Sequence, residues 1–351
     1  MIKRKYLSAV STSDWHLDGG LTRFFPLKAM EKQLFEIEKI FKYAVENDIR
    51  HIFMPGDLSD KARISETTFI ALVTLLMRYD KHLSFYYSLG NHDMAMVGKT
   101  SMDVLKVFAD SGVFKNVHLF STPEVMEIDG IDVAFVPFPH KEAPKTKRPK
   151  LIFAHVEETG AMGDYGTPLK SAGMKLQRSE RDYTISGHLH TYQVLKKQRI
   201  LYNGAPYQKT FGESPNKGFI HFYAKYSVDE LLVKHEFVNN RPQFRLDTLK
   251  IESSEDWQKI EAGEHVFYRV YLGEGVVAPK NIVREFPNII QINGTTYRGK
   301  AVVEDKVDAK SIPKITPTTG LVDFLTRFEL SKTEVKRAVG IVKEAIQELN
   351  N

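Results

Sequence analysis

Five short stretches of the chain place aspartate, asparagine or histidine where a strand is expected to end. They are Asp14-Trp15-His16, Gly56-Asp57, Gly90-Asn91-His92-Asp93, Ala154-His155 and Gly187-His188-Leu189-His190. Apart from Asp93 they supply two aspartates, one asparagine and five histidines, enough oxygen and nitrogen ligands for two divalent metal ions. Two adjacent metal ions activate water for attack on phosphate esters. Any one stretch alone is common by chance, but the five together predict a two-metal phosphoesterase.

The residue types indicate what the ligands would do. Asp57 stands alone in its motif and is the natural candidate to bridge two ions about 3.5–4 Å apart. Asn91 offers a neutral oxygen, which limits the negative charge facing an anionic substrate. Imidazole and carboxylate ligands suit Mn, Fe, Zn or Co better than Mg. A metal-bound water whose pKa falls to about 7 supplies hydroxide at neutral pH.

Apolar runs before these stretches are expected to form the strands that position them. They cover residues 5–12, 51–54, 83–88, 151–154 and 183–185. Between the first two runs, apolar residues recur at helical spacing from Leu34 to Ala44. Alternating strands and helices favour an α/β domain, in which ligands gather beyond the carboxyl ends of the strands. Trp15 is expected to pack in the core, with stacking on a nucleotide base as the alternative.

The five motifs, in this order, resemble those of the calcineurin-like metallophosphoesterases. Within that superfamily the chain looks most like the SbcD-type DNA repair nucleases, the bacterial and phage relatives of the meiotic-recombination-eleven nuclease. Asn203-Gly204-Ala205-Pro206 followed by Phe211-Gly212-Glu213 is similar to a stretch after the last motif of those nucleases. The resemblance implies an α/β (α+β) fold: a four-layer β-sandwich flanked by helices, with a small α/β capping domain and a C-terminal helical pair. The expected boundaries are 1–251 for the nuclease domain, 252–305 for the DNA-capping domain, 306–317 for a linker and 318–351 for the helical segment.

The resemblance also implies the role of each site residue. One metal would be held by Asp14, His16, Asp57 and His190, and the second by Asp57, Asn91, His155 and His188, with manganese as the expected metal. His92 would stand outside both metals, near the scissile phosphate, as transition-state stabiliser or proton donor. The chain departs from the family pattern at Ala205, where a hydroxyl residue is usual. It departs again at Asp60, where some members carry a second catalytic histidine.

Composition limits the remaining possibilities. With 351 residues the chain is long enough for two domains and an appendage, and it has no cysteine and a formal net charge of +5. The lack of cysteine excludes disulfides and thiolate metal ligands and suits a reducing cytoplasm, which is the expected location. No apolar run approaches the roughly 20 residues of a membrane span, and the N-terminus is expected to enter a strand rather than a signal peptide.

Basic residues cluster in a loop before His155, where Lys145, Lys147, Arg148 and Lys150 lie close in sequence. They are candidates for a rim that follows the phosphates of DNA without reading bases; a solvated charged loop is the alternative. Since no zinc-finger or aromatic RNA-binding motif is present, sequence-specific recognition is not expected.

Two further patterns suggest protein partners. In the C-terminal segment an apolar stripe runs through Val335, Val339, Val342 and Ile346. The family resemblance favours docking of this stripe on the coiled coil of an SbcC-like ATPase, and packing on its own domain is the alternative. Residues 69–77 read as a helix that is apolar almost all round, which predicts a homodimer unless the domain itself buries both faces.

The family resemblance implies a manganese-dependent 3′-to-5′ exonuclease and endonuclease. It would act on DNA ends as the nuclease subunit of an ATPase–nuclease complex in double-strand break repair and recombination. A phosphoesterase for a small phosphodiester or monoester is the first alternative. A DNA-end tethering scaffold that retains its metals is the second.

Overall fold

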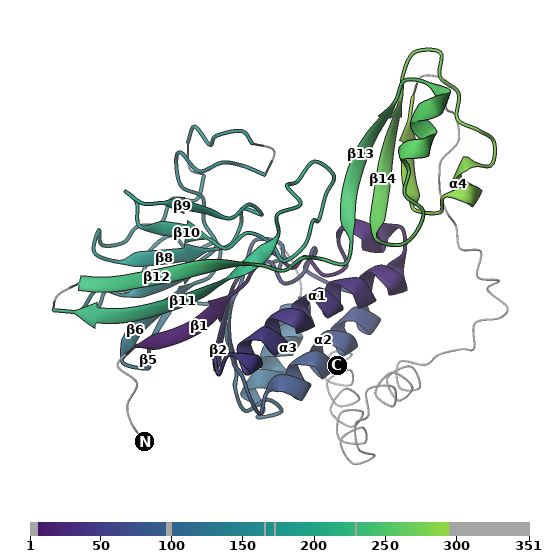
Figure 1. Cartoon of the computed structure of the whole chain (residues 1–351). Coiled ribbons are helices and arrows are strands. Elements are labelled where there is room, and N and C mark those ends of the chain that lie inside the picture. Colours follow the sequence, from purple (N-terminus) through teal and green to yellow (C-terminus); the bar gives the residue numbers. More distant parts are fainter. Residues whose placement is uncertain (1–5, 96–99, 165, 172, 229, 295–351) are drawn as a thin grey trace.

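The computed structural model describes residues 6–95, 100–164, 166–171, 173–228 and 230–294 (Figure 1). Within them, two six-stranded mixed sheets face each other as a sandwich, and a three-stranded sheet forms a smaller unit beside it. The predicted linker and C-terminal helical segment lie outside the described residues. The same is true of the four candidate docking residues Val335, Val339, Val342 and Ile346.

The first sheet contains the strands that lead to the first three ligand motifs. In spatial order it consists of β12 (Glu230–Asn239), β11 (Gly218–Ser227), β1 (Leu7–Ser11), β2 (His51–Pro55), β3 (Ser84–Ser88) and β4 (Val117–Phe120). Strands β1 to β4 run parallel, so their carboxyl ends lie at one edge of the sheet. Asp14, Asp57 and Asn91 follow β1, β2 and β3, and they therefore emerge at this edge.

The second sheet carries the two remaining motifs. Its spatial order is β5 (Glu124–Ile128), β6 (Ile131–Val136), β7 (Leu151–Ala154), β8 (Tyr183–Ser186), β10 (Ile200–Tyr202) and β9 (Gln193–Leu195). Strands β6, β7, β8 and β10 run parallel, whereas β5 and β9 are antiparallel edge strands. His155 directly follows β7 and His188 lies just beyond β8, so both emerge from carboxyl ends as well.

Stacked aromatic rings fill the space between the two sheets. Phe53 of β2 lies parallel to Phe153 of β7 with ring centroids 4.1 Å apart, and Phe120 lies parallel to Phe135 at 3.8 Å. All four side chains are buried. Because each such ring removes a large apolar area from water, these pairs hold the sheets face to face. The ligand-bearing edges of the two sheets are thereby brought together.

Three helices cover the outer face of the first sheet: α1 (Pro26–Glu46), α2 (Glu66–Tyr79) and α3 (Ser101–Asp110) (Figure 1). A 3₁₀ turn, η1 (Gly20–Arg23), precedes α1. Proline at the first position of α1 suits a helix start, because its missing N–H has no intrahelical partner there. The predicted stripe is buried at Ile37, Ile40, Phe41 and Ala44. None of the helices in the described ranges has the length and apolar character that crossing a bilayer requires.

Helix α2 contains the stretch 69–77 from which a dimer was predicted. Leu72 and Leu76 are fully buried within one chain, and Phe69 and Met77 are partly buried against the same core. Helix α1 packs along one side of α2, and the ring of Phe108 in α3 contacts that of Phe69. Since this chain covers both sides of the helix, its apolar character does not require a second copy. The homodimer therefore stays a prediction, and the apolar character of α2 no longer supports it.

Loops cover the outer face of the second sheet, where the expected fourth layer was helical. Residues Ala143, Val156 and Leu176 pack against its apolar side chains. In the described part of the β7–β8 connection the chain forms turns and isolated bridges, with left-handed glycines at Gly160 and Gly166. Glycine in this conformation interrupts a right-handed helix. The layer is therefore present, but the described residues build it without helices.

The small unit begins earlier than the expected boundary at residue 252. Its sheet consists of β13 (Arg245–Ile251), β14 (Val266–Leu272) and β15 (Ile289–Asn293), all parallel, with η2 (Ser254–Lys259) and α4 (Ile282–Glu285). Strand β13, assigned from the sequence to the nuclease domain, pairs with β14 along its whole length. Helix α4 is only four residues long, and Pro279 and Pro287 flank it closely. Proline disfavours the helical conformation of the residue before it and lacks the backbone donor.

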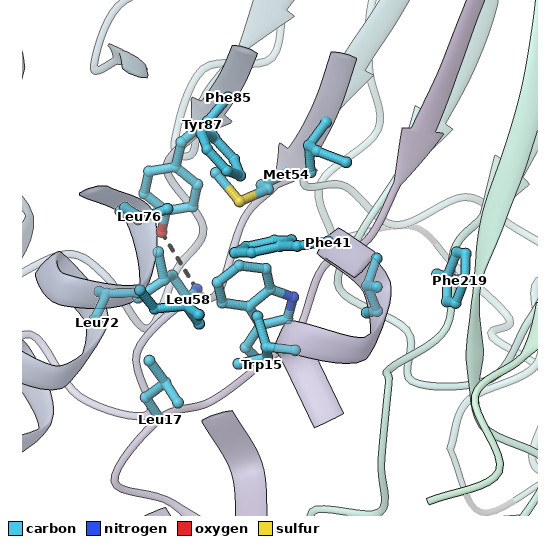
Figure 2. Close-up of a cluster of buried hydrophobic side chains, with 14 of the residues drawn as sticks. Trp15, Leu17, Phe41, Met54, Leu58, Leu72, Leu76, Phe85, Tyr87 and Phe219 are labelled. Atoms are coloured by element: carbon cyan, nitrogen blue, oxygen red, sulfur yellow. Dashed lines mark hydrogen bonds between the residues drawn. The ribbon is translucent and has the colours of Figure 1, made fainter. Parts of the chain in front are cut away.

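A buried cluster beneath the first two ligand motifs joins their loops to the helices (Figure 2). Trp15 packs against Phe41 of α1, with ring centroids 6.0 Å apart, and its indole N–H donates to Thr12 Oγ1 at 3.0 Å. Tyr207 donates a further hydrogen bond to the Trp15 carbonyl. At 1% exposure, Trp15 is a packing residue, so its ring is not available to stack on a base. It holds the backbone between Asp14 and His16 in place.

Candidate metal centre

All seven predicted metal ligands meet at the edge shared by the two sheets. Four of them have left-handed backbone conformations: Asp14 (φ 57°), His16 (φ 45°), Asp57 (φ 55°) and His188 (φ 85°). Such φ values are unfavourable for residues other than glycine and persist only where the surrounding structure enforces them. They turn each ligand sharply out of its strand and towards the others.

One group of ligands gathers around His16 and His190. The two Nε2 atoms are 3.0 Å apart, and Nε2 of His16 lies 3.6 Å from Oδ2 of Asp57. Ligand atoms of Asp14, His16 and His190 all lie within 4.8 Å of one another. This is the set expected for the first metal.

A second group gathers on the other side of Asp57. Oδ2 of Asp57 lies 3.2 Å from Nε2 of His155, and that nitrogen is 3.0 Å from Oδ1 of Asn91. Nδ1 of His188 lies 3.2 Å from the same Asn91 oxygen and 3.3 Å from His155 Nε2. A single carboxylate oxygen of Asp57 thus faces both groups, which is the position that a bridging ligand needs.

The far nitrogen of three ligand histidines faces an oxygen acceptor. His155 donates from Nδ1 to the carbonyl of Pro55 at 3.0 Å, and Nδ1 of His190 faces Glu213 Oε1 at 3.3 Å. His188 is reversed, with Nε2 facing Glu157 Oε1 at 2.9 Å. A neutral imidazole carries one proton, so a proton on the far nitrogen leaves the inward nitrogen with a lone pair for a metal.

The donor set fits two metal ions. Two ligands that each lie about 2.1 Å from one ion are about 3.0 Å apart at a right angle and about 3.4 Å apart at the tetrahedral angle. The inward contacts between His16 and His190 and among His155, Asn91 and His188 fall between 3.0 and 3.3 Å. Lone pairs aimed at one another in a buried site repel unless a proton or a metal ion lies between them.

Burial and the central carboxylate shift the histidines in opposite directions. Burial lowers the pKa of His16 to about 4, although its hydrogen bond to Asp60 acts the other way. Burial would also lower the pKa of His155, but the charge of Asp57 outweighs it and raises that pKa to about 9. Burial acts to raise the pKa of Asp57, and the neighbouring His155 and His16 hold it well below its usual range. Asp57 therefore remains an anion that attracts cations.

His92 lies beside the first group, and one of its ring nitrogens lies within 4.8 Å of ligand atoms of His16 and Asp57. Its backbone N–H donates to Asp57 Oδ1 at 2.9 Å, and its Nδ1 donates to the carbonyl of Asp60 at 2.9 Å. Its ring meets that of His16 edge-on, with centroids 4.7 Å apart. The side chain is only partly buried, and its other nitrogen, Nε2, is not engaged by these contacts.

Several residues around the ligands were assigned no definite role from the sequence. Asp93 is fully buried and accepts hydrogen bonds from the backbone N–H groups of Asp57, Ser59 and Gly90 at 2.8–2.9 Å. Glu213, which belongs to the Phe-Gly-Glu stretch, contacts His190. Lys209 and Glu157 were not singled out, because no spacing rule connects them with the ligands.

Two of the four residues of the predicted basic rim form ion pairs within the chain. The buried ammonium of Lys150 pairs with Asp182 at 2.9 Å, and Arg148 pairs with Asp132 and Glu127 and covers the ring of Tyr226. Asp132 and Lys150 border the amino ends of β6 and β7, opposite the metal edge. Lys145 and Lys147 are exposed. Arg148 and Lys150 thus have charged partners within the chain, although Arg148 is exposed, and a role of either in DNA binding stays a prediction.

Comparisons with known proteins agree with this site. The family model described as calcineurin-like phosphoesterase matches residues 9–192, more than half of the chain. The chain is similar to GAP50, the anchor in the inner membrane complex of Plasmodium, with a TM-score of 0.42 and 12% identity, over 68% of this chain and 86% of that one. It is also similar to the calcineurin-like phosphoesterase YfkN from Bacillus subtilis, with a TM-score of 0.39 and 11% identity, over 67% of this chain and 91% of that one.

Neither structural likeness is close enough to carry an argument about this chain. The family match, in contrast, spans all five motifs and all seven predicted ligands. The chain therefore belongs to the calcineurin-like phosphoesterase family and is a metal-dependent phosphoesterase.

Proposed function

We propose that this phosphoesterase is a nuclease that hydrolyses phosphodiesters at DNA ends, with manganese as its metal and an SbcC-like ATPase as its partner. The motif Gly-Asn-His-Asp at 90–93 and the stretches 203–206 and 211–213 support the proposal, since they resemble those of SbcD-type nucleases. A formal net charge of +5 is compatible with a polyanionic substrate.

The observation that carries the proposal is the attachment of the small unit to a loop of the metal centre. The Gln208 side chain donates to the Leu246 carbonyl at 3.2 Å and accepts from the Leu246 N–H at 2.9 Å. The guanidinium of Arg269 lies over the ring of Phe211 at 4.4 Å. The same loop carries Lys209 and Glu213, which contact His16 and His190. A folded unit fixed beside the metals offers contact surface to a polymer, whereas a small ester needs none.

Each residue of the site would have a distinct role in the reaction. Bound at the two ligand groups, the metal ions would supply an activated hydroxide and neutralise charge on the phosphate. Asp57 would hold both ions, and Asn91 would add an oxygen without adding negative charge. Nδ1–H of His92 donates to the Asp60 carbonyl and would keep the ring oriented. In the imidazolium form of the ring, Nε2 would face the phosphate and donate its proton to the leaving oxygen, which leaves a neutral imidazole.

An assay of two substrates in two metals tests the proposal. Linear duplex DNA and a small ester such as bis-p-nitrophenyl phosphate would each be incubated with Mn²⁺ or Mg²⁺. We expect cleavage of the duplex from its ends in Mn²⁺, and loss of that cleavage in His92→Asn. The matched control is His82→Asn, since His82 is an exposed histidine before β3, at the amino end of that strand. Hydrolysis of the small ester alone would contradict a nuclease, and unchanged cleavage by His92→Asn would contradict the role of His92.

A further inference from the structure

Two charged groups of opposite sign lie behind the ring of the ligand His16. Nδ1 of His16 faces two charged groups, Oδ1 of Asp60 at 3.5 Å and the ammonium of Lys209 at 3.0 Å. Those two groups pair with each other at 2.8 Å. The Asp60 side chain is 3% exposed and that of Lys209 is 14% exposed, so the pair lies in the interior beside the metal ligands.

Only one member of this pair can accept a hydrogen bond from Nδ1 of a His16 whose Nε2 binds a metal. Its Nε2 points at His190 and Asp57, so the proton of the ring must reside on Nδ1 when Nε2 binds a metal. An ammonium has no lone pair and cannot accept that proton. The Asp60 carboxylate can accept it. A buried carboxylate needs a compensating charge, and Lys209 supplies it.

The same construction occurs behind the second histidine of this metal group. Nδ1 of His190 faces Glu213 Oε1 at 3.3 Å, and the other oxygen of Glu213 pairs with Lys217 at 2.7 Å. The side chains of Glu213 and Lys217 are each 1% exposed. Both histidines are thus backed by a carboxylate that a lysine neutralises, and Nδ1 of His190 also lies 3.2 Å from a second carboxylate oxygen, Oδ2 of Asp164. His155, in the other group, is backed by a neutral backbone carbonyl.

Two glycines leave room for the Asp60–Lys209 pair. A Cβ atom on Gly19 would lie 2.5 Å from the carboxyl carbon of Asp60, which is far closer than atoms can approach. A Cβ atom on Gly20 would lie 2.7 Å from the Lys209 carbonyl, and Gly20 also has a positive φ of 59°. The loop after the first ligand motif therefore closes directly over the pair only because both residues lack side chains.

We propose that Asp60 and Lys209 are a positioning pair for His16: Asp60 accepts the proton on Nδ1, and Lys209 holds Asp60 in place. Asp60 stands where some related nucleases carry a second catalytic histidine. In this chain it would help to retain the metal. The inference goes beyond the proposed function, because it concerns the metal centre and holds whether DNA or a small ester is the substrate.

Metal binding by Asp60→Asn tests the pair. The amide can donate to Nδ1, which favours the ring form with its proton on the metal-binding nitrogen. We expect one of the two sites to lose Mn²⁺ affinity by about 10–100-fold in equilibrium dialysis, the usual effect of removing such a partner, while the other keeps its affinity. The visible absorption of the Co²⁺-loaded protein should change as well, because it reports the ligand geometry directly.

Two variants of Lys209 and one distant control complete the experiment. Lys209→Met should weaken the same site, and Lys209→Arg should restore most of its affinity because it keeps the charge next to Asp60. Lys150→Met breaks a different buried lysine–aspartate pair, which lies at the opposite edge of the sheets. It should lower the melting temperature and leave Mn²⁺ affinity and the Co²⁺ spectrum unchanged.

The outcomes separate a positioning role from a general loss of stability. A folded Asp60→Asn protein with two wild-type Mn²⁺ affinities and an unchanged Co²⁺ spectrum would overturn the proposal. Loss of metal from Lys150→Met to the same extent would overturn it too, since any buried ion pair would then have the same effect. If Asp60→Asn does not fold, Gly19→Ala takes its place: it keeps the carboxylate but displaces it, and an unchanged Co²⁺ spectrum in that variant would also refute the pair.

Discussion

The carboxylate of Asp93 accepts a hydrogen bond from the backbone N–H of Asp57 at 2.8 Å, so the last residue of one ligand motif fixes the backbone of another. Its oxygens also accept from Ser59, Gly90 and the hydroxyl of Tyr87. Asp93 thus ties the loop after β2 to the loop after β3. The left-handed conformation of Asp57 is held by this set of bonds, because both loops share one acceptor.

Asp93→Asn should therefore loosen the bridging ligand. The amide replaces one accepting oxygen with a donor that faces other donors, which should cost about 2–4 kcal/mol of stability. We expect lower metal content as well as a lower melting temperature. The matched control is Asp80→Asn: Asp80 is also buried and accepts from two backbone N–H groups, those of Lys115 and Asn116, but it lies outside the metal centre. Full metal content in Asp93→Asn would show that Asp57 needs no such support.

Asp57→Ala and His92→Asn should separate metal binding from turnover. Asp57 faces both ligand groups, so its removal leaves the repulsion between two ions uncompensated, and activity and metal content should both be lost. His92 is assigned a role outside the coordination shell, so His92→Asn should keep both metals and lose activity by about 100-fold or more. Elemental analysis of the purified variants measures how much metal each retains and so tests both expectations. Loss of both metals from His92→Asn would make His92 a ligand instead.

The basic loop should contribute to DNA binding through two residues, not four. Lys145 and Lys147 are exposed, whereas Arg148 and Lys150 have partners within the chain. Replacing both exposed lysines with glutamine should reduce the slope of log affinity against log salt by about 1.8 if each contacts one phosphate. Arg148→Gln should leave the slope unchanged. An unchanged slope in the double variant would remove this loop from the DNA path. A reduced slope in Arg148→Gln would show that Arg148 contacts a phosphate despite its ion pairs.

The ligand positions could be predicted from the sequence because each ligand follows an apolar strand, and parallel strands deliver their carboxyl ends to one edge. The contacts behind the ligands could not. Lys209 lies 193 residues from His16 along the chain, and only the fold brings the two side chains together. Local charge density did not reveal that Arg148 pairs with Asp132, which lies 16 residues earlier along the chain. Phe69 and its neighbours were read as a surface in need of a partner, but α1 and α3 cover them.

The last prediction concerns the C-terminal segment, which lies outside the described residues. If residues 318–351 dock on an ATPase, truncation at Pro317 should leave a folded protein with intact metal-dependent activity on short DNA. The stripe at Val335, Val339, Val342 and Ile346 would have no task within the chain, so its loss should barely change the melting temperature. Association with the ATPase and any ATP-stimulated cleavage should disappear together.

A single charge in the stripe should have the same effect as the truncation. Val339→Glu would place an unpaired carboxylate in the interface, where burial without a partner is costly. Arg337→Glu is the control, since helical spacing puts residue 337 on the opposite side of the predicted helix. A thermal melt beside a pull-down with the ATPase distinguishes the two possibilities. If the truncated protein unfolds or aggregates, the segment belongs to the core of this chain, because only an element packed within the chain can stabilise it in the absence of the partner.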